Sequence, residues 1–89
     1  MLLAIDIGNT NVTLGVFTNE ELRATWRMAT DINRMPDEYA IFLLAFLRHQ
    51  GMDAPDINAI AMCSTVPPLT APFQELCNKY FNTSPLVIG

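Results

Sequence analysis

Two apolar stretches near the start of the chain flank a short polar segment, Asp6-Ile7-Gly8-Asn9-Thr10-Asn11. The first stretch covers residues 2–5. The second covers residues 12–17, where side chains alternate in the period-2 pattern of a half-buried strand. So short a break between two strand-like runs leaves room only for a reversal of direction. We therefore expect a tight hairpin of two antiparallel strands.

The composition of this turn exceeds what a reversal requires. An ordinary hairpin turn needs only Asn-Gly or Asp-Gly, whose residues tolerate positive φ angles. Here the carboxylate of Asp6 precedes Gly8, and three small polar residues follow over 9–11. Backbone N–H groups and hydroxyls in such a turn can approach phosphate oxygens, and a neighbouring carboxylate can hold a hydrated divalent cation. The alternative for Asp6 is a turn aspartate that caps the hairpin backbone.

Size and composition limit the chain to one small domain. It has 89 residues, 51% of them apolar, which excludes disorder. The formal charge is −4 without a basic cluster, so nucleic acid is not an expected partner. No basic leader or membrane-length apolar run is present, and we expect a cytoplasmic protein. Cys63 and Cys77 fall in apolar settings and are expected to be reduced core thiols.

The rest of the chain predicts strands and helices in alternation. After the hairpin we expect a strand over 22–29, a helix from Pro36 to a stop at Gly51, a strand over 57–63, a helix over 67–81 and a strand over 86–88. A helix between two strands favours parallel pairing, and the apolar first strand is expected to be central and covered on both faces.

The strand over 22–29 is predicted to divide its side chains between two faces. Leu22 is expected to share one face with Ala24, Trp26 and Met28. The other face carries two arginines and a threonine, which are either solvated or directed at a ligand. At the start of the following helix, Arg34 either meets an anionic group or pairs with the acids of the first helical turn, Asp37 and Glu38.

The order β-β-β-α-β-α-β is the layout of the ribonuclease-H-like half domain from which actin-like ATPases are built. We therefore predict the α/β class with a mixed sheet. The chain stops as its last strand leaves the core. Our working hypothesis is that residues 1–89 are the N-terminal part of one such half domain, truncated from a longer protein.

Four segments resemble type III pantothenate kinases, in the same order along the chain. The first contains the Asp-x-Gly-Asn-Thr of residues 3–11, and the second is 26–31. Residues 34–39 are similar to the family's Arg-Thr-x-Asp-Glu-Tyr helix start, and residues 63–70 to its Ser-Ser-Val-Val-Pro-Pro-Leu segment. Met35 stands where the family usually has threonine, so a side-chain helix cap is expected to be missing.

The resemblance implies a site for ATP with Mg²⁺. It places Asp6 toward the phosphates and their Mg²⁺, reached through water, and makes residues 6–13 the phosphate loop. The implied ATP-binding residues are Asp6, Ile7, Gly8, Asn9, Thr10, Asn11, Val12 and Thr13. The family often carries a lysine near Thr13, which this chain does not. Ser64 and Thr65 follow a parallel strand, where they either line the substrate cleft or cap the next helix.

The resemblance further implies ATP-dependent phosphorylation of pantothenate to 4'-phosphopantothenate, the first step of coenzyme A biosynthesis. Family members continue into a Gly-Ala-Asp-Arg segment, whose aspartate is implied to activate the pantothenate hydroxyl. The second half domain, the site for a monovalent cation (K⁺ or NH₄⁺) and most of the homodimer interface also lie in that continuation. We therefore expect no catalytic base in these 89 residues, no kinase activity from them alone, and self-association.

Two other functions remain open from the sequence. One is a regulatory nucleotide-binding protein related to the Bvg accessory factor type, in which the loop is kept for binding or structure. The other is an interaction module whose hairpin holds no ligand. The kinase and the regulatory protein would both use the phosphate loop, whereas the loop would bind nothing in the interaction module.

Overall fold

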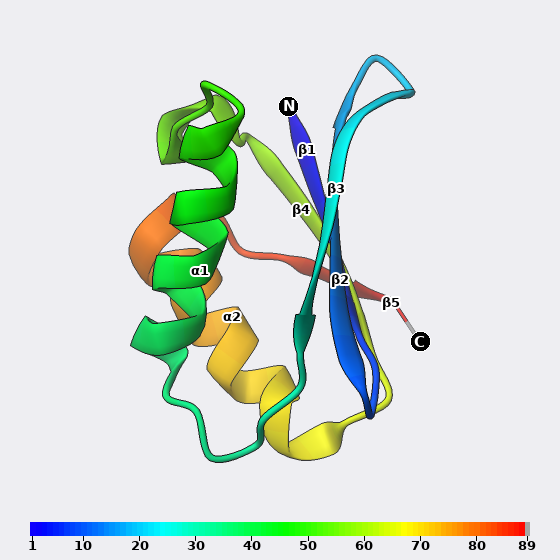
Figure 1. Cartoon of the computed structure of the whole chain (residues 1–89), viewed down its shortest axis with the longest axis vertical. Coiled ribbons are helices and arrows are strands. Elements are labelled where there is room, and N and C mark those ends of the chain that lie inside the picture. The colour runs from blue at the N-terminus through cyan, green and yellow to red at the C-terminus, as the bar shows by residue number, and fades with distance from the viewer. Residues whose placement is uncertain (89) are drawn as a thin grey trace.

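The computed structural model describes residues 1–88 as one mixed sheet with helices on one side (Figure 1). Its elements are β1 (Leu2–Ile7), β2 (Asn11–Thr18), β3 (Glu21–Ala29), α1 (Pro36–His49), the 3-10 helix η1 (Ala54–Asp56), β4 (Ala59–Ser64), α2 (Pro67–Phe81) and β5 (Leu86–Ile88). The strand order is β3-β2-β1-β4-β5. The predicted order of elements is confirmed, and β1 is central. Neither α1 nor α2 combines the length and apolar character of a membrane-crossing helix.

The pairing of β1 joins the two halves of the sheet. β1 and β2 are antiparallel, as are β2 and β3, whereas β4 runs parallel to both β1 and β5. Parallel pairing requires a crossover, and α1 and α2 supply the two that this sheet needs. The C-terminal ends of β1 and β4 therefore lie side by side at one end of the sheet, at the bottom of Figure 1, beside the β1–β2 connection.

Only one face of the sheet is covered. Side chains of β1 that face the helices, such as Leu3 and Ile5, are at most 2% exposed and pack in one core with α1 and α2. The expectation that β1 is covered on both faces is wrong for residues 1–88, because both helices lie on the same side (Figure 1). Alternation sends Ala4 and Asp6 to the other face, which we call the open face.

A β-bulge changes which side chains of β3 reach the core. Val16 pairs with Ala24, but the next residue of β2, Phe17, pairs with Leu22, so Arg23 is an extra residue in β3. The bulge turns Leu22 to the open face, where 52% of it is exposed. The prediction that Leu22 shares a face with Ala24 is therefore wrong, while the rest of that predicted face is half-buried against the core.

The start of α1 is stabilised differently from what the sequence predicted. Met35 is the N-cap and provides no side-chain hydrogen bond, as expected. Its own N–H instead donates to the Glu38 carboxylate at 2.8 Å. Arg34 pairs with neither acid of the first turn. Its guanidinium lies 5.2 Å and 5.0 Å from the ring centres of Tyr39 and Phe42, a cation–π arrangement.

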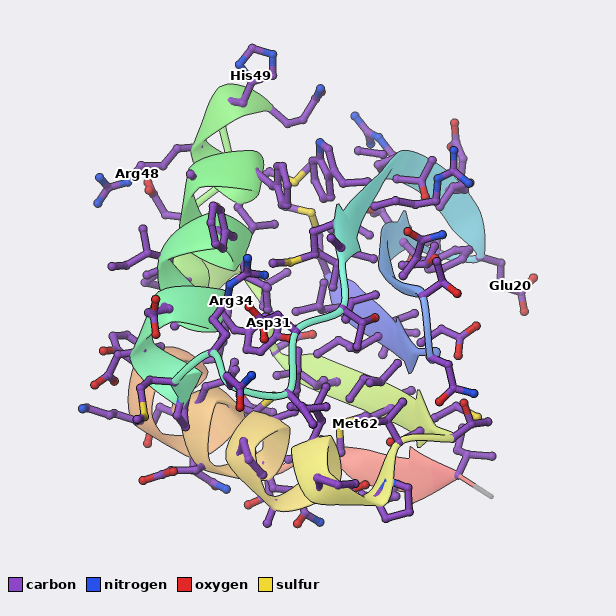
Figure 2. The ribbon with its side chains drawn as sticks, turned by 60° about the horizontal axis from the view of Figure 1, so that its bottom comes forward. Glu20, Asp31, Arg34, Arg48, His49 and Met62 are labelled. Atoms are coloured by element: carbon purple, nitrogen blue, oxygen red, sulfur yellow. The ribbon has the colours of Figure 1, made fainter. Side chains whose placement is uncertain are left out.

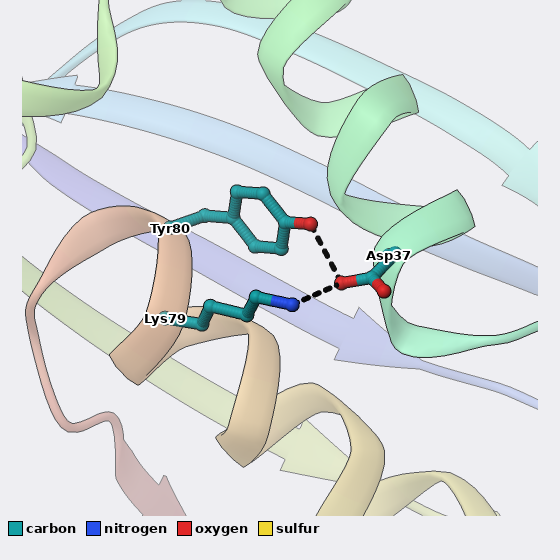
Figure 3. A network of polar contacts seen from close by, with 3 residues as sticks. All are labelled: Asp37, Lys79 and Tyr80. Carbon is teal, nitrogen blue, oxygen red and sulfur yellow. Dashed lines mark hydrogen bonds and ion pairs between the residues drawn. The ribbon is translucent and has the colours of Figure 1, made fainter.

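Asp37 ties α1 to α2 (Figure 3). The hydroxyl of Tyr80 donates to its carboxylate at 2.6 Å, and the Lys79 ammonium lies 3.0 Å from the same oxygen. The Tyr80 hydrogen bond, followed by that of Lys79, lowers the pKa of Asp37. The hydrogen bond to Asp37 in turn raises the pKa of Lys79 and that of Tyr80. The predicted interaction of Asp37 with the helix dipole is thus joined by a tertiary contact.

The two cysteines lie in different environments. Cys77 is buried between α2 and the sheet, and burial raises the pKa of its thiol to about 12. Cys63 is exposed, because its position opposite Asp6 in the β1–β4 pair places it on the open face. The expectation of a core thiol is confirmed for Cys77 and wrong for Cys63.

Asp37→Asn is expected to lower the free energy of unfolding in a pH-dependent way. A lowered folded pKa means that the carboxylate stabilises the fold above its unfolded pKa, and that this stabilisation is lost as pH falls through the folded value. Because the pKa values of Lys79 and Tyr80 are raised in the fold, the stabilisation from this contact is lost again as pH rises through those folded values. Urea unfolding from pH 2 to 11 measures the difference. Asp53→Asn, which removes an exposed pair with Arg48 at 3.6 Å, is the control. The same dependence of unfolding free energy on pH in both variants would contradict a stabilising contact of Asp37 with α2.

The open face is expected to cause self-association. Large apolar side chains on it are uncovered, including Leu22 and Leu86, which is 69% exposed. Leu22 and Leu86 lie on the two edge strands of the sheet, and large exposed apolar patches are rare on monomers. Leu86→Lys should reduce the mass measured by light scattering, whereas Ile41→Lys, an equally exposed apolar residue on α1, should not. A monodisperse monomer of the unaltered chain would contradict this expectation.

Candidate functional site

The connection between β1 and β2, which we call the tip (residues 8–10), is not an ordinary hairpin turn. The β2–β3 connection is one, since Asn19 and Glu20 have φ angles of 50° and 69°. No residue of the tip has a positive φ. Gly8 is needed there for space, because a Cβ at this position would lie 3.1 Å from the carbonyl oxygen of Asn11, to which the Gly8 N–H donates at 2.9 Å.

Four carbonyl oxygens around the tip accept hydrogen bonds from the chain itself, while that of Asn9 has no partner within residues 1–88. Asn11 accepts from Gly8, as described above, and Ile7 accepts from the Thr65 N–H at 3.0 Å. The carbonyls of Gly8 and Thr10 accept from the hydroxyl and the N–H of Thr30, at 2.7 Å and 2.9 Å. These donors come from the connections that follow β3 and β4. The tip is therefore held by two segments distant in sequence.

The backbone N–H groups of Asn9 and Thr10 have no hydrogen-bond partner within residues 1–88. Both residues are exposed, as is Asn11, so amide and hydroxyl groups surround these N–H groups. Adjacent unpaired backbone N–H groups in a turn form a concavity suited to an anion. The unpaired polar groups of the tip thus include the donors that phosphate oxygens require.

Asp6 lies in β1 rather than in the turn. It is exposed on the open face, opposite Thr13 of β2, and its carboxylate accepts no hydrogen bond and forms no ion pair within residues 1–88. The alternative of a turn aspartate that caps the hairpin backbone therefore has no support. Along the open face, Arg27 of β3 is opposite Thr13 and is also exposed. The arginine face of β3 thus borders the tip.

A divalent cation fits the donor set around Asp6. Within the described residues, no three acidic, histidine or cysteine side chains gather as a metal-ligand cluster. Mg²⁺ is usually bound through one or two carboxylates, several waters and the phosphates of its substrate. A single exposed carboxylate next to unpaired N–H groups matches that pattern of ligands.

Two of the candidate residues can contribute only their backbones. The side chains of Ile7 and Val12 are 0% exposed and belong to the core. They fix the two strand ends from which the tip emerges. In the phosphate loop, Ile7 and Val12 therefore hold the loop to the core, and the residues between them are the ones that can make polar contacts.

Ser64 and Thr65 lie beside the tip, where β4 ends. The Ser64 hydroxyl accepts the N–H of Val66 and lies 3.1 Å from the carbonyl oxygen of the same residue. Thr65 binds the Ile7 carbonyl with its N–H and, at 3.3 Å, with its hydroxyl. Neither is the N-cap of α2, which is Val66 without a side-chain cap. The structure brings both residues to the end of the sheet where the tip lies, because β1 and β4 are parallel and end together.

Thr30 is the contact residue that sequence reasoning missed. Its signals were its place directly after a predicted strand and inside the family-like segment of residues 26–31. Figure 2 shows its neighbour Asp31 close to Arg34, in the connection between β3 and α1. The same figure shows His49, the single histidine, at the far end of α1. The tip and the nearby Asp6 therefore present hydroxyl, amide and carboxylate groups, whereas the histidine is remote.

Comparison with known sequences assigns the whole chain to one family. A family model described as type III pantothenate kinase matches residues 2–89. Type III pantothenate kinases from three strains of Dehalococcoides mccartyi are 48% to 49% identical to the chain over 88 residues. The match covers 99% of this chain. The chain spans about a third, 34%, of the length of these curated relatives.

Comparison with solved structures supports the fold. The ROK hexokinase from Thermus thermophilus has a TM-score of 0.69 at 15% identity, over 98% of this chain and 34% of that one. The PPX-GPPA enzyme of Aquifex aeolicus has a TM-score of 0.54 at 12% identity, over 98% and 35%. At such identities the likeness concerns the fold alone. The predicted ribonuclease-H-like, actin-like ATPase fold is confirmed.

Proposed function

The chain belongs to the type III pantothenate kinase family, and on that premise we propose that it supplies the ATP phosphate-binding loop of a pantothenate kinase. Residues 1–89 would form the N-terminal part of one half domain, with residues 6–13 as the loop. The whole protein would transfer the γ-phosphoryl group of ATP to pantothenate. The observation that carries this proposal is the tip, where the carbonyls of Gly8 and Thr10 are occupied while the N–H groups of Asn9 and Thr10 are unpaired within residues 1–88.

The tip would bind the phosphates through donors that are already in place. Phosphoryl transfer depends mainly on positioning and on stabilising the charge spread over phosphate oxygens. Backbone N–H groups fixed by a rigid loop do this without reorganisation at the moment of reaction. Asn9, Thr10 and Asn11 would add side-chain donors. The family often has a lysine near Thr13, and in this chain the cation opposite Thr13 on the open face is Arg27.

Asp6 would hold Mg²⁺ through water beside the phosphates. When bound, this ion neutralises charge on the phosphate oxygens. Asp6 suits this role because its carboxylate is exposed and unpaired within residues 1–88. The carboxylate stands one residue before the buried Ile7, so the strand fixes where it projects.

The remaining parts of the proposal are expectations that the resemblance to the family supports. Ser64 and Thr65 would border the pantothenate cleft, since they share the sheet edge with the tip. The whole protein would be a cytoplasmic homodimer that uses a monovalent cation, K⁺ or NH₄⁺, bound outside these residues. Its partners would be ATP and pantothenate, without nucleic acid or membrane.

Calorimetry of the 89-residue chain with ATP, up to millimolar concentration and with or without Mg²⁺, tests the role of Asp6. We expect Mg²⁺ to strengthen ATP binding and Asp6→Asn to remove that gain, a loss of about tenfold for an interaction worth about 1.4 kcal/mol. Glu20→Gln is the control, because it removes an exposed acid at the other end of the sheet (Figure 2). Equal Mg²⁺-dependent heats for the unaltered chain and Asp6→Asn would refute the assignment.

A further inference from the structure

We propose that Thr30 is a positioning residue for the tip, an inference that rests on the proposed function. Thr30 follows β3 directly. Its hydroxyl donates to the Gly8 carbonyl at 2.7 Å, and its N–H donates to the Thr10 carbonyl at 2.9 Å. One residue thus holds the carbonyls on both sides of Asn9. The two bonds turn these acceptors toward β3 and leave the N–H groups of Asn9 and Thr10 for phosphate.

The chain on the C-terminal side of Thr30 is fixed to the helical layer. The N–H of Asp31 donates to the Tyr39 hydroxyl at 2.9 Å, and that hydroxyl donates to the Asp31 carbonyl at 2.7 Å. Tyr39 is 0% exposed, and its ring centre lies 4.7 Å from that of Phe73 in α2. Thr30 is therefore connected to the packed core through one residue. It is a rigid support for the tip rather than part of a free loop.

The chain on the N-terminal side of Thr30 is also held. The Arg34 guanidinium donates to the Ala29 carbonyl at 3.2 Å while it stacks over the Tyr39 ring. Both neighbours of Thr30 therefore have a backbone group bonded to a side chain, Ala29 to Arg34 of the connection and Asp31 to Tyr39 of α1. Figure 2 shows the two labelled residues of this connection, Asp31 and Arg34, close together.

The physical benefit is order in the tip before ligand binds. Exposed hairpin tips built from small polar residues are ordinarily the least ordered part of a strand pair. A ligand that must order such a segment loses affinity to the entropy of ordering. The net contribution of one hydrogen bond corresponds to a factor of about three to ten in an equilibrium constant. This factor is the expected effect of the Thr30 hydroxyl on affinity.

Three variants separate positioning from general stability. Thr30→Val removes the hydroxyl and keeps the β-branched shape, whereas Thr30→Ser keeps the hydroxyl. Thr25→Val is the matched control, because the Thr25 hydroxyl also donates across β3 and β2, to the Leu14 carbonyl at 2.9 Å, but away from the tip. Amide ¹⁵N relaxation of Asn9 and Thr10 is measured without ligand. ATP affinity with Mg²⁺ is then measured by calorimetry, and stability by urea unfolding.

We expect Thr30→Val to make both tip amides more mobile and to weaken ATP binding about three- to tenfold. Thr30→Ser should stay within about twofold of the unaltered chain, and Thr25→Val should lose stability without losing affinity. A tip that stays ordered in Thr30→Val, or an affinity equal to that of Thr25→Val, would overturn the inference. If the unaltered chain binds no ATP, the proposed function fails and the positioning role with it. The relaxation data are taken without ligand. They therefore show whether Thr30 orders the tip even if the chain binds no ATP.

Discussion

Hydrogen bonds to the carbonyl oxygens of the hairpin tip are the constraint on which the rest of the site depends. A hairpin alone has no means of directing its carbonyls to one side and its N–H groups to the other. Here Thr30 and Thr65 bind those carbonyls from the connections after β3 and β4. Both connections lead into the helices that cover one face of the sheet. The phosphate-binding geometry is therefore a consequence of the whole fold, not of residues 6–11 alone.

The open face of the sheet is divided between two kinds of surface. Near the tip it carries Asp6, Thr13 and Arg27, which are polar and lie side by side in the strand register. At the far end of β3, and on β5 at the other edge of the sheet, it carries apolar side chains such as Leu22 and Leu86, both exposed. The polar part is the proposed ligand side of the site. The apolar part has the character of a surface that packs against another layer of protein, which fits a chain that spans a third of its relatives' length.

Local patterns were sufficient to predict the elements and the place of the candidate site. Period-2 and period-3.6 apolar patterns, Pro36 and Gly51 set the strands and helices, because these signals act over a few residues. The turn composition located the tip for the same reason. Leu22 was assigned to the wrong face because a bulge reverses alternation and leaves no mark in the sequence. The partners of Arg34 and the contacts of Thr30 were out of reach, because both depend on segments that only tertiary packing brings together.

The central claim is that the tip presents unpaired backbone N–H groups to a metal-bound triphosphate. Titration of the ¹⁵N-labelled chain with inorganic tripolyphosphate and Mg²⁺, followed by amide chemical shifts, tests it most directly, because this ligand lacks the nucleoside and the acceptor substrate. We predict that the amide resonances of Asn9 and Thr10 shift most and saturate together, while those of the Asn19–Glu20 turn stay unchanged. Saturable shifts elsewhere with none at Asn9 and Thr10, or no shifts at all, would contradict the account.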